Sequence, residues 1–397
     1  MTNKISERIK LGETDIYVSP VGFGVLPMGP GQLALPVETG AELIVYALEQ
    51  GINFIDTAQY YRTHGYIRRA LEMLEAHRTE ACPQVGEGSG APLAGARAAA
   101  DASMDLGRPP AFGACAERRA RAAQQDQGRH GRAARATSEA DVLGRIGSGE
   151  RPVISSKTLA TDYEQAAAAI EEERRALGVE CIDIFLLHEL RSGQFAERHG
   201  AWRALQDAKA AGKVRAIGAS THHVDVVEEL ASVPACDIIF PLINYAGMGI
   251  RRGRCAATAA DMEQAIAKAS AAGKGIYTMK ALGGGNLAAH YQEALNYAFS
   301  RQGVSSVMLG FGCRHDIDDI VSYLDGTMSP DYNPDVSSKR VRVNHEDCEG
   351  CGTCIPVCAS GAISFSDADG LAVIDQSRCV TCGYCAQACP VRAIIMY

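Results

Sequence analysis

The chain has 397 residues, more than one typical domain needs, and its 47% hydrophobic content is enough for a large core. Its formal net charge of −8 argues against a general nucleic-acid-binding surface. No apolar run approaches the roughly 18 residues of a membrane span, and the first residues, MTNKISERIKLGETD, lack the apolar centre of a secretion signal.

Residues 1–330 alternate β-rich runs with helical stretches. A hairpin is expected around residues 9–18, and eight apolar runs follow it: VGFGVLPM, NFIDTA, VISSKT, DIFLLHE, VRAIGAST, DIIFPLIN, GIYTMKAL and SVMLGFG. Continuous runs of this kind suit parallel strands that are buried on both faces. Amphipathic stretches such as ETGAELIVYALEQ and YEQAAAAIEEERRALG lie between them. This alternation predicts an α/β fold, a (β/α)8 TIM barrel. A doubly wound sheet is the alternative, but no G-x-G-x-x-G sequence opens the first unit.

A segment of low complexity interrupts the barrel pattern. Residues from about 81 to 150 are rich in Ala, Gly and Arg and sustain neither a period of 2 nor one of 3.6. Such a composition buries little apolar surface, so we expect a disordered or loosely helical insertion. A partner-binding arm, through the basic run RRARAAQQDQGRHGRAARA, and a sequence from a shifted reading frame are the alternatives. The segment lies between the second helix and the third strand, which predicts a place on the N-terminal face, opposite the catalytic face.

Two cysteine runs with the spacing C-x2-C-x2-C-x3-C follow a polar linker at residues 331–339. This is the ligand pattern of two-cluster ferredoxins, in which the fourth cysteine of each run binds the other cluster. We therefore predict two [4Fe–4S] clusters. One is assigned to Cys348, Cys351, Cys354 and Cys389, and the other to Cys358, Cys379, Cys382 and Cys385. Residues 340–397 thus predict a small α+β ferredoxin-like domain, each half being strand, cysteine loop, short helix and strand.

Zinc ribbons and disulfides are the other uses of clustered cysteines. A zinc site would want four ligands in two pairs rather than two runs of four. Outside the runs, six cysteines are scattered without a pattern: Cys82, Cys115, Cys181, Cys236, Cys255 and Cys313. Iron–sulfur clusters and free thiols both indicate a reducing, cytoplasmic location.

Four ionisable residues fall near the C-terminal ends of consecutive strand candidates. Asp56 lies in NFIDTA, Lys157 in VISSKT and His188 in DIFLLHE, while Tyr61 follows Asp56 by five residues. This end of a barrel carries the catalytic groups. A lysine ammonium beside a tyrosine favours the phenolate and makes the phenol a better acid. Taken singly, each residue also has a structural interpretation: a turn cap for Asp56, a solvated strand end for Lys157 and a core histidine for His188.

NFIDTAQYY, VISSKT and DIFLLHE resemble the catalytic segments of the aldo-keto reductases. The resemblance covers roughly residues 9–324, apart from the insertion. It implies a barrel that binds NADPH or NADH without a Rossmann domain and reduces a small carbonyl, with the four residues above as a catalytic tetrad. The spacing of the family selects Tyr61 over Tyr60 as the general acid. The chain looks like a subgroup that carries a C-terminal ferredoxin-type domain.

The same resemblance implies contacts with the nicotinamide cofactor. GASTHH resembles the segment that holds the carboxamide, MKALGGG the pyrophosphate loop, and LGFGCRHDIDDIV the adenosine-phosphate segment. The glycines Gly283 to Gly285 allow close approach of the backbone, and Arg314 could pair with a 2′-phosphate, which favours NADPH over NADH. The implied cofactor-binding residues are Ser220, Thr221, Met279, Gly283, Gly284, Gly310, Gly312 and Arg314.

Three functions remain open on the sequence. Reduced nicotinamide gives two electrons as hydride, whereas each cluster carries one, and no flavin site is evident that would convert between them. The first hypothesis is an NAD(P)H-dependent carbonyl reductase whose clusters are structural or redox-sensing. The second is an oxidoreductase whose clusters exchange electrons with a redox partner protein or a further cofactor. The third is a redox-sensing binding protein with little turnover. None of the three calls for nucleic acid or a membrane.

Overall fold

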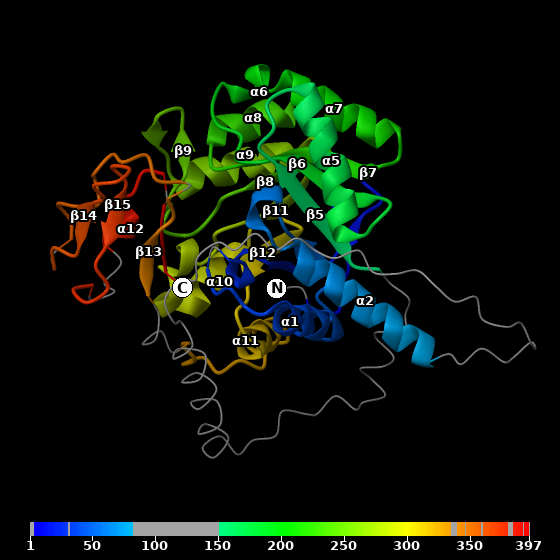
Figure 1. Cartoon of the computed structure of the whole chain (residues 1–397), viewed down its shortest axis with the longest axis horizontal. Coiled ribbons are helices and arrows are strands. Elements are labelled where there is room, and N and C mark those ends of the chain that lie inside the picture. Colours follow the sequence, from blue (N-terminus) through cyan, green and yellow to red (C-terminus); the bar gives the residue numbers. More distant parts are fainter. Residues whose placement is uncertain are drawn as a thin grey trace, which may run out of the picture.

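The computed structural model of the chain describes residues 4–30, 32–81, 151–334, 340–345, 347–358, 360–379, 384–391 and 393–396. Its largest part is a closed barrel of eight parallel strands that is ringed by helices (Figure 1). A smaller group of short strands and a helix, formed by the residues after 340, lies to one side of the barrel. The predicted (β/α)8 architecture is therefore confirmed.

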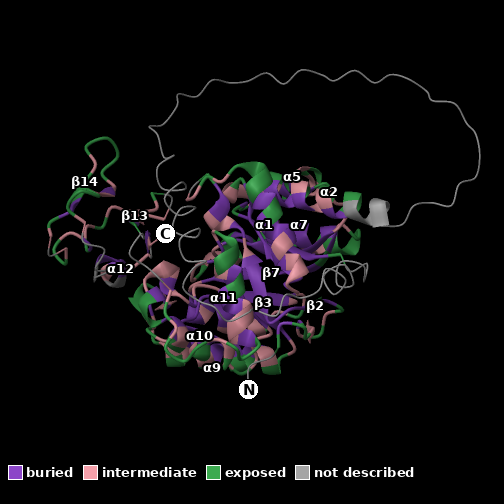
Figure 2. Cartoon of the chain, turned by 90° about the horizontal axis from the view of Figure 1, so that it is seen from below, coloured by how far each residue is buried: buried purple, intermediate pink, exposed green. Residues whose placement is uncertain are grey.

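Each of the eight predicted apolar runs supplies one barrel strand. The strands pair in chain order, and the last returns to the first to close the barrel. Both faces of the strands are covered, so every residue of the third and fourth is buried, and Figure 2 shows the strands in its buried centre. The strands are β3 (Val21–Gly24), β4 (Phe54–Asp56), β5 (Val153–Thr158), β6 (Ile182–Leu187), β7 (Val214–Thr221), β8 (Ile238–Pro241), β11 (Gly275–Thr278) and β12 (Ser306–Gly310).

A helix follows each strand and packs its apolar face on the barrel. Local caps set the limits of some of them: α5 begins after Asp162, whose carboxylate accepts a hydrogen bond from the N–H of Gln165 at 2.9 Å, and ends at Gly178, which has a φ of 70°. Among the helices that the structure describes, none has the length and apolarity to cross a membrane. The main helices are α1 (Val37–Glu49), α2 (His64–Ala81), α5 (Tyr163–Leu177), α7 (His199–Ala210), α8 (Val224–Ala231), α9 (Ala259–Ala271), α10 (Tyr291–Phe299) and α11 (Arg314–Leu324).

The predicted N-terminal hairpin closes one end of the barrel. Its strands β1 (Ile9–Lys10) and β2 (Tyr17–Val18) are antiparallel. Leu11 and Ile16, in and beside the turn between them, are almost completely buried and join the same apolar cluster as the barrel residue Phe54. The hairpin thus closes the N-terminal end of the barrel and leaves the C-terminal end open for a site.

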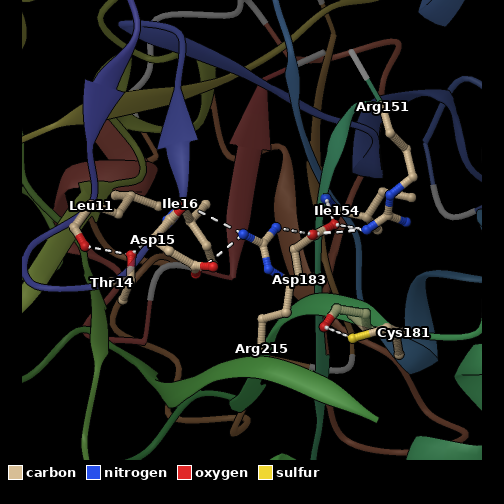
Figure 3. Close-up of polar contacts among 10 residues, drawn as sticks. Leu11, Thr14, Asp15, Ile16, Arg151, Ile154, Cys181, Asp183 and Arg215 are labelled. Carbon is tan, nitrogen blue, oxygen red and sulfur yellow. Dashed lines mark hydrogen bonds and ion pairs between the residues drawn. The ribbon is translucent and has the colours of Figure 1, made fainter. Parts of the chain in front are cut away.

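A buried carboxylate organises the same N-terminal face (Figure 3). Asp183, at the start of β6, accepts hydrogen bonds from Arg151 at 2.8 Å, from Arg215 at 2.7 Å and from the N–H of Ile154 at 2.9 Å. Arg151 is the first described residue after the predicted insertion, of which residues 82–150 lie outside the described residues. The chain therefore enters β5 from the N-terminal face of the barrel.

The C-terminal part is built from two short antiparallel pairs. β13 (Val341–Val343) pairs with β16 (Ile394–Met396), and β14 (Ile363–Phe365) pairs with β15 (Ala372–Ile374). The predicted short helix appears in the second half as α12 (Tyr384–Ala388). In the first half, the corresponding described residues form turns rather than a helix. The ferredoxin-like architecture is confirmed, with this local difference.

The start of the predicted linker packs on the barrel. The side-chain amide of Gln292 donates to the carbonyl oxygens of Ser329 at 2.8 Å and of Tyr332 at 2.9 Å, and the Tyr332 hydroxyl donates to Asp319. The chain is thus held against α10 and α11 before it continues into residues 335–339, which lie outside the described residues.

Candidate functional site

The four predicted catalytic residues meet at the C-terminal end of the barrel. Asp56 is the last residue of β4, Lys157 is the fifth of the six in β5, and His188 directly follows β6. Tyr61 ends a short 3-10 helix, η2 (Gln59–Tyr61), in the loop after β4. Because β4, β5 and β6 are neighbouring parallel strands, their C-terminal ends bring these side chains together.

A buried ion pair forms the centre of the group. The ammonium of Lys157 lies 2.7 Å from Asp56 Oδ2 and donates a second hydrogen bond to the carbonyl oxygen of Thr57 at 2.5 Å. Lys157 is only 1% exposed, which rules out a solvated strand end. Burial lowers the pKa of Lys157 and raises the pKa of Asp56, and the attraction between the two charges opposes both shifts.

Two hydroxyls that the sequence analysis missed support this pair. Tyr277 donates to Asp56 Oδ1 at 3.4 Å, and its own oxygen lies 2.7 Å from Ser155 Oγ. Ser155 stands two residues before Lys157 on β5, so both side chains point into the barrel. In the sequence, the only sign of these two residues was a polar side chain within an otherwise apolar strand.

Tyr61 and His188 form the second half of the group. Tyr61 Oη lies 3.5 Å from His188 Nε2, and the Lys157 ammonium lies 5.2 Å from the centre of the Tyr61 ring. The Tyr60 ring lies 5.1 Å from the His188 ring and so packs on the imidazole. His188 Nδ1 is buried and has no hydrogen-bond partner among the described residues, which leaves it available to a polar atom of a ligand.

Burial keeps both of these groups neutral. It raises the pKa of Tyr61 well above its ordinary value, and the nearby Tyr60, Asp56, Asp347 and Glu189 raise it further. Burial also lowers the pKa of His188 well below its usual range, assisted by the positive charge of Lys157. In this structure the desolvation of the phenolate therefore outweighs the ammonium effect expected from the sequence.

A buried arginine that the sequence analysis also missed holds the strand ends. Arg198 donates to three carbonyl oxygens: to His188 at 2.8 Å, to Thr158 at 2.9 Å and to Ala160 at 3.0 Å. It is 4% exposed, and burial lowers its pKa to about 10. Arg198 thus connects the end of β5, next to Lys157, to His188.

The residues predicted to hold the nicotinamide lie on the same end of the barrel. Ser220 Oγ accepts a hydrogen bond from the N–H of Glu189 at 2.9 Å. The Thr221 hydroxyl donates to Leu190 O at 2.7 Å and accepts from the N–H of His223 at 2.9 Å. Both hydroxyls therefore join β7 to the loop after His188. Met279, which directly follows β11, is partly buried against both apolar clusters of the barrel.

The glycine loops follow the two neighbouring strands. Gly283, Gly284 and Gly285 form η3 (Gly283–Gly285) with φ values of 59°, 68° and 88°, a conformation that glycine adopts without strain. Gly310 ends β12, and the N–H of Gly312 donates to Asp316 at 2.7 Å. The exposed guanidinium of Arg314, which begins α11, lies 4.9 Å from the centre of the Tyr46 ring. Glycine turns, which let a ligand approach the backbone closely, and an arginine at a helix start suit a dinucleotide's phosphates, so these segments fit the cofactor class.

The predicted ligands of the first cluster, Cys348, Cys351, Cys354 and Cys389, are all described: Cys354 and Cys389 are buried in one apolar cluster, and Cys348 packs against it. Among the described residues, no three of the side chains that could bind a metal are placed together as a ligand group, so the ligand set of this cluster stays a prediction. Burial raises the pKa of Cys354, and the charges of Cys389, Cys351 and Cys348 raise it further. Cys389 Sγ accepts a hydrogen bond from the N–H of Ala393 at 3.3 Å. Sulfur ligands that accept such bonds are typical of iron–sulfur sites, so these residues fit a cluster.

The second predicted set is described in part. Cys358 Sγ accepts a hydrogen bond from the N–H of Ala362 at 3.2 Å, and hydrogen bonding, first of all with Ser360, lowers the pKa of Cys358. Cys379 and Cys385 are described, while Cys382 lies outside the described residues. The ligand set of this cluster stays a prediction.

Family models match both parts of the chain. The aldo/keto reductase family model matches residues 135–293, and the 4Fe-4S dicluster domain model matches residues 347–393. The barrel part of the chain thus matches the aldo-keto reductase family over residues 135–293, and the C-terminal part matches a 4Fe-4S dicluster domain. Both recognised families were those expected from the sequence motifs, and they place the chain among the oxidoreductases.

Known proteins resemble the two parts separately. The chain is 46% identical over 50 residues to the thiosulfate reductase electron transfer subunit PhsB of Salmonella typhi, covering 13% of this chain and 25% of that protein. It is 34% identical over 93 residues to the uncharacterized oxidoreductase YtbE of Bacillus subtilis, covering 23% of this chain and 31% of that protein. The chain thus spans less than a third of the length of each of these relatives.

A solved structure resembles the barrel. A putative aldo-keto reductase from Pseudomonas aeruginosa superposes with a TM-score of 0.52 at 18% identity, over 83% of this chain and 99% of the other. At this identity the likeness supports the fold, and the chemistry rests on the residues described above.

Proposed function

We propose that the protein is an NAD(P)H-dependent oxidoreductase that reduces a small aldehyde or ketone, with Tyr61 as the general acid, and that it carries two [4Fe–4S] clusters. The observation that carries the proposal is the placement of Tyr61 Oη beside His188 Nε2, at 3.5 Å, and above the buried Lys157–Asp56 pair. A neutral phenol next to a buried ammonium can give up a proton and have the resulting anion stabilised.

The chain's own residues have separate tasks in this reaction. When bound, reduced nicotinamide supplies a hydride to the carbonyl carbon. The carbonyl oxygen takes the π electron pair and then the proton from Tyr61 Oη, and water returns a proton to the phenolate afterwards. Lys157, which Asp56 and the Thr57 carbonyl hold in place, stabilises that phenolate. Neutral His188 orients the substrate oxygen or the phenol by a hydrogen bond.

The cofactor would lie across the ends of β7, β11 and β12. Ser220, Thr221 and Met279 are proposed to hold the nicotinamide, in line with their position beside the loop after His188. The dinucleotide's phosphates are assigned to the glycine loops and the start of α11, with the residues Gly283, Gly284, Gly310, Gly312 and Arg314. An arginine at this place supports NADPH as the preferred form.

The clusters would be held by the two cysteine sets predicted from the spacing. Cys348, Cys351, Cys354 and Cys389 are proposed as ligands of the first cluster, in line with their spacing and with the burial of Cys354 and Cys389 in one apolar cluster. When bound, each cluster supplies a one-electron redox centre. The second cluster is assigned to Cys358, Cys379, Cys382 and Cys385.

One observation favours a second candidate, in which the clusters exchange electrons with a redox partner protein. The C-terminal part matches electron-transfer proteins, including a subunit named for that role. In this alternative, the partner donates or accepts single electrons at the clusters, and the barrel acts on the same substrate. A redox-sensing protein with little turnover is the third candidate, and Tyr61 would be dispensable for its activity.

Anaerobic NADPH oxidation tests the proposal. We expect the purified protein to oxidise NADPH only when an aldehyde, ketone or quinone from a panel is present, with the iron–sulfur absorbance constant. Tyr61→Phe is expected to lower kcat/KM by about 100-fold or more, the size of a general-acid contribution. Tyr60→Phe is the matched control, since it removes a neighbouring hydroxyl and keeps the ring on His188. Cluster bleaching by NADPH that is independent of Tyr61 would instead support the electron-transfer candidate.

A further inference from the structure

The glycine loop η3 has a second neighbour besides the proposed cofactor. A Cβ atom added at Gly285 would lie 2.5 Å from the carbonyl oxygen of Met396, and one added at Gly284 would lie 3.6 Å from Ile395 Cγ2. Both partners belong to β16, in the C-terminal domain. Gly285 therefore has no space for a side chain, because the backbone of the cluster domain occupies it.

The amide groups of the same loop are engaged in its own turns. The N–H of Gly283 donates to Lys280 O at 2.8 Å, and the N–H of Gly285 donates to Leu282 O at 2.9 Å. In this conformation the loop presents its outer surface to β16 and keeps these two donors inside. A phosphate needs outward-pointing donors at such a turn.

Apolar packing extends the contact on both sides of the loop. Met248 and Leu287, from the barrel, are buried in one cluster with Val341 and Ile394, from the C-terminal domain. The cluster includes the predicted ligands Cys354 and Cys389 as well. Burial of apolar side chains from both parts stabilises the docked arrangement.

Polar contacts fix the orientation of the domain at the catalytic end. Arg191, three residues after His188, forms an ion pair with Glu349 at 3.1 Å. Arg251, which begins the short hairpin strand β9 (Arg251–Arg252), donates to the carbonyl oxygen of Pro390. Glu349 and Pro390 each directly follow a predicted ligand of the first cluster in sequence. Figure 1 shows the C-terminal domain beside the barrel, with β13 nearer to it than β14.

We propose that η3 is a shared docking site, at which β16 of the cluster domain and the pyrophosphate of the dinucleotide exclude one another. In the docked state described above, the cluster domain covers the loop, and the cofactor binds after β16 leaves it. Docking of the domain thus regulates access to the catalytic site. This inference rests on the proposed NAD(P)H-dependent function and adds a regulatory role for the cluster domain.

The proposal predicts how mutations that weaken docking change cofactor affinity. The apparent dissociation constant rises as the binding-competent fraction falls, so loosening the domain should tighten NADPH binding. Ile395→Ser removes the side chain that packs on Gly284, and Ile374→Ser makes the same change on β15, on the pair of strands away from η3. Arg251→Gln, on the barrel side, removes the bond to Pro390 without altering the cluster domain.

NADPH affinity is measured anaerobically on full-length protein, with iron content checked for each variant. We expect Ile395→Ser and Arg251→Gln to lower the NADPH dissociation constant by about threefold or more and Ile374→Ser to leave it unchanged. Equal affinity in wild type and all variants would overturn the shared-site proposal while leaving the cofactor assignment intact. Absence of NADPH and NADH binding in every variant would overturn the cofactor assignment and the proposal together.

If docking of β16 weakens NADPH binding, NADPH binding must weaken the docking of β16 to the same extent, and this effect can be measured independently. If NADPH displaces β16, the thiol introduced by Ile395→Cys should be alkylated faster when NADPH is bound, because Ile395 is only 7% exposed in the docked state. The thiol introduced by Ile374→Cys serves as the control and should react at the same rate with and without NADPH. An alkylation rate of the Ile395→Cys protein that saturating NADPH leaves unchanged, or lowers, would contradict mutual exclusion.

Discussion

The guanidinium of Arg198, which directly precedes α7, donates a hydrogen bond of 2.8 Å to the carbonyl oxygen of His188, which directly follows β6. The same side chain reaches Thr158 O, directly after Lys157. One buried cation thereby fixes the relative position of two members of the catalytic tetrad. It does so through the backbone, so it acts as a positioning residue rather than a catalytic one.

Replacing Arg198 with methionine should therefore destabilise the barrel and disturb the site. Three buried carbonyl oxygens would lose their donor, and we expect a loss of about 3 kcal/mol in the free energy of unfolding. Urea unfolding followed by the fluorescence of Trp202, the sole tryptophan of the chain and a buried residue of α7, measures it. Arg203→Met, within α7, the helix that Arg198 directly precedes, is the control. A stability equal to that of wild type would mean that the three bonds contribute nothing net.

Removing one partner of the Lys157–Asp56 pair should cost more than removing both. Lys157→Met leaves the Asp56 carboxylate buried without its counter-charge, and we expect a loss of about 3–5 kcal/mol. The double change Asp56→Asn with Lys157→Met should recover most of that stability while catalysis stays lost. A double variant that is less stable than Lys157→Met alone would contradict the view that the penalty comes from an unpaired buried charge.

Stability should fall as the pH drops through the ordinary pKa of histidine. Because burial holds the pKa of His188 well below 6.5, the folded state keeps it neutral while the unfolded chain takes up a proton. The contribution is present above about pH 6.5 and is lost at about 1.4 kcal/mol per pH unit below it. In unfolding experiments between pH 5 and 7, the free energy of unfolding of the His188→Gln protein should depend less steeply on pH, by the equivalent of one proton. Identical slopes in the two proteins would show that His188 takes up its proton at the same pH in the folded and unfolded states, which would contradict the lowered pKa.

The cluster ligands can be separated from the other cysteines by iron content. Cys354→Ser should remove the first cluster and thus about half of the bound iron, since the spacing of the cysteines assigns this thiol to that cluster. Cys313→Ser changes an exposed cysteine at the start of α11 and should leave iron unchanged. Full iron content in the Cys354→Ser protein would contradict the assignment.

The parts of the fold that follow from local patterns could be predicted from the sequence. Each barrel strand arises from a continuous apolar run, and the spacing of Asp56 and Tyr61 placed both at one end of the barrel. The convergence with Lys157 and His188 followed from the geometry of neighbouring parallel strands rather than from any local signal.

The missed features depend on contacts between distant residues. Arg198 looks like a surface residue at the start of an amphipathic helix, and only the folded chain shows the carbonyl groups around it. Gly285 signals a turn, but its sequence context does not reveal that β16 lies against it. The direction of the Tyr61 pKa shift likewise depends on burial, which cannot be read from the spacing of residues in the sequence.

Transfer of deuterium from NADPH labelled at the nicotinamide C4 position tests the central claim most directly. The labelled cofactor, a reducible aldehyde and the wild-type or Tyr61→Phe protein are incubated without oxygen, and the alcohol product is examined by mass spectrometry. The account predicts one deuterium on the carbinol carbon with wild type, formation of this labelled alcohol about 100-fold or more slowly with Tyr61→Phe, and unchanged cluster absorbance throughout. An unlabelled alcohol that forms together with reoxidation of reduced clusters would contradict it and show that the electrons come from the iron–sulfur domain.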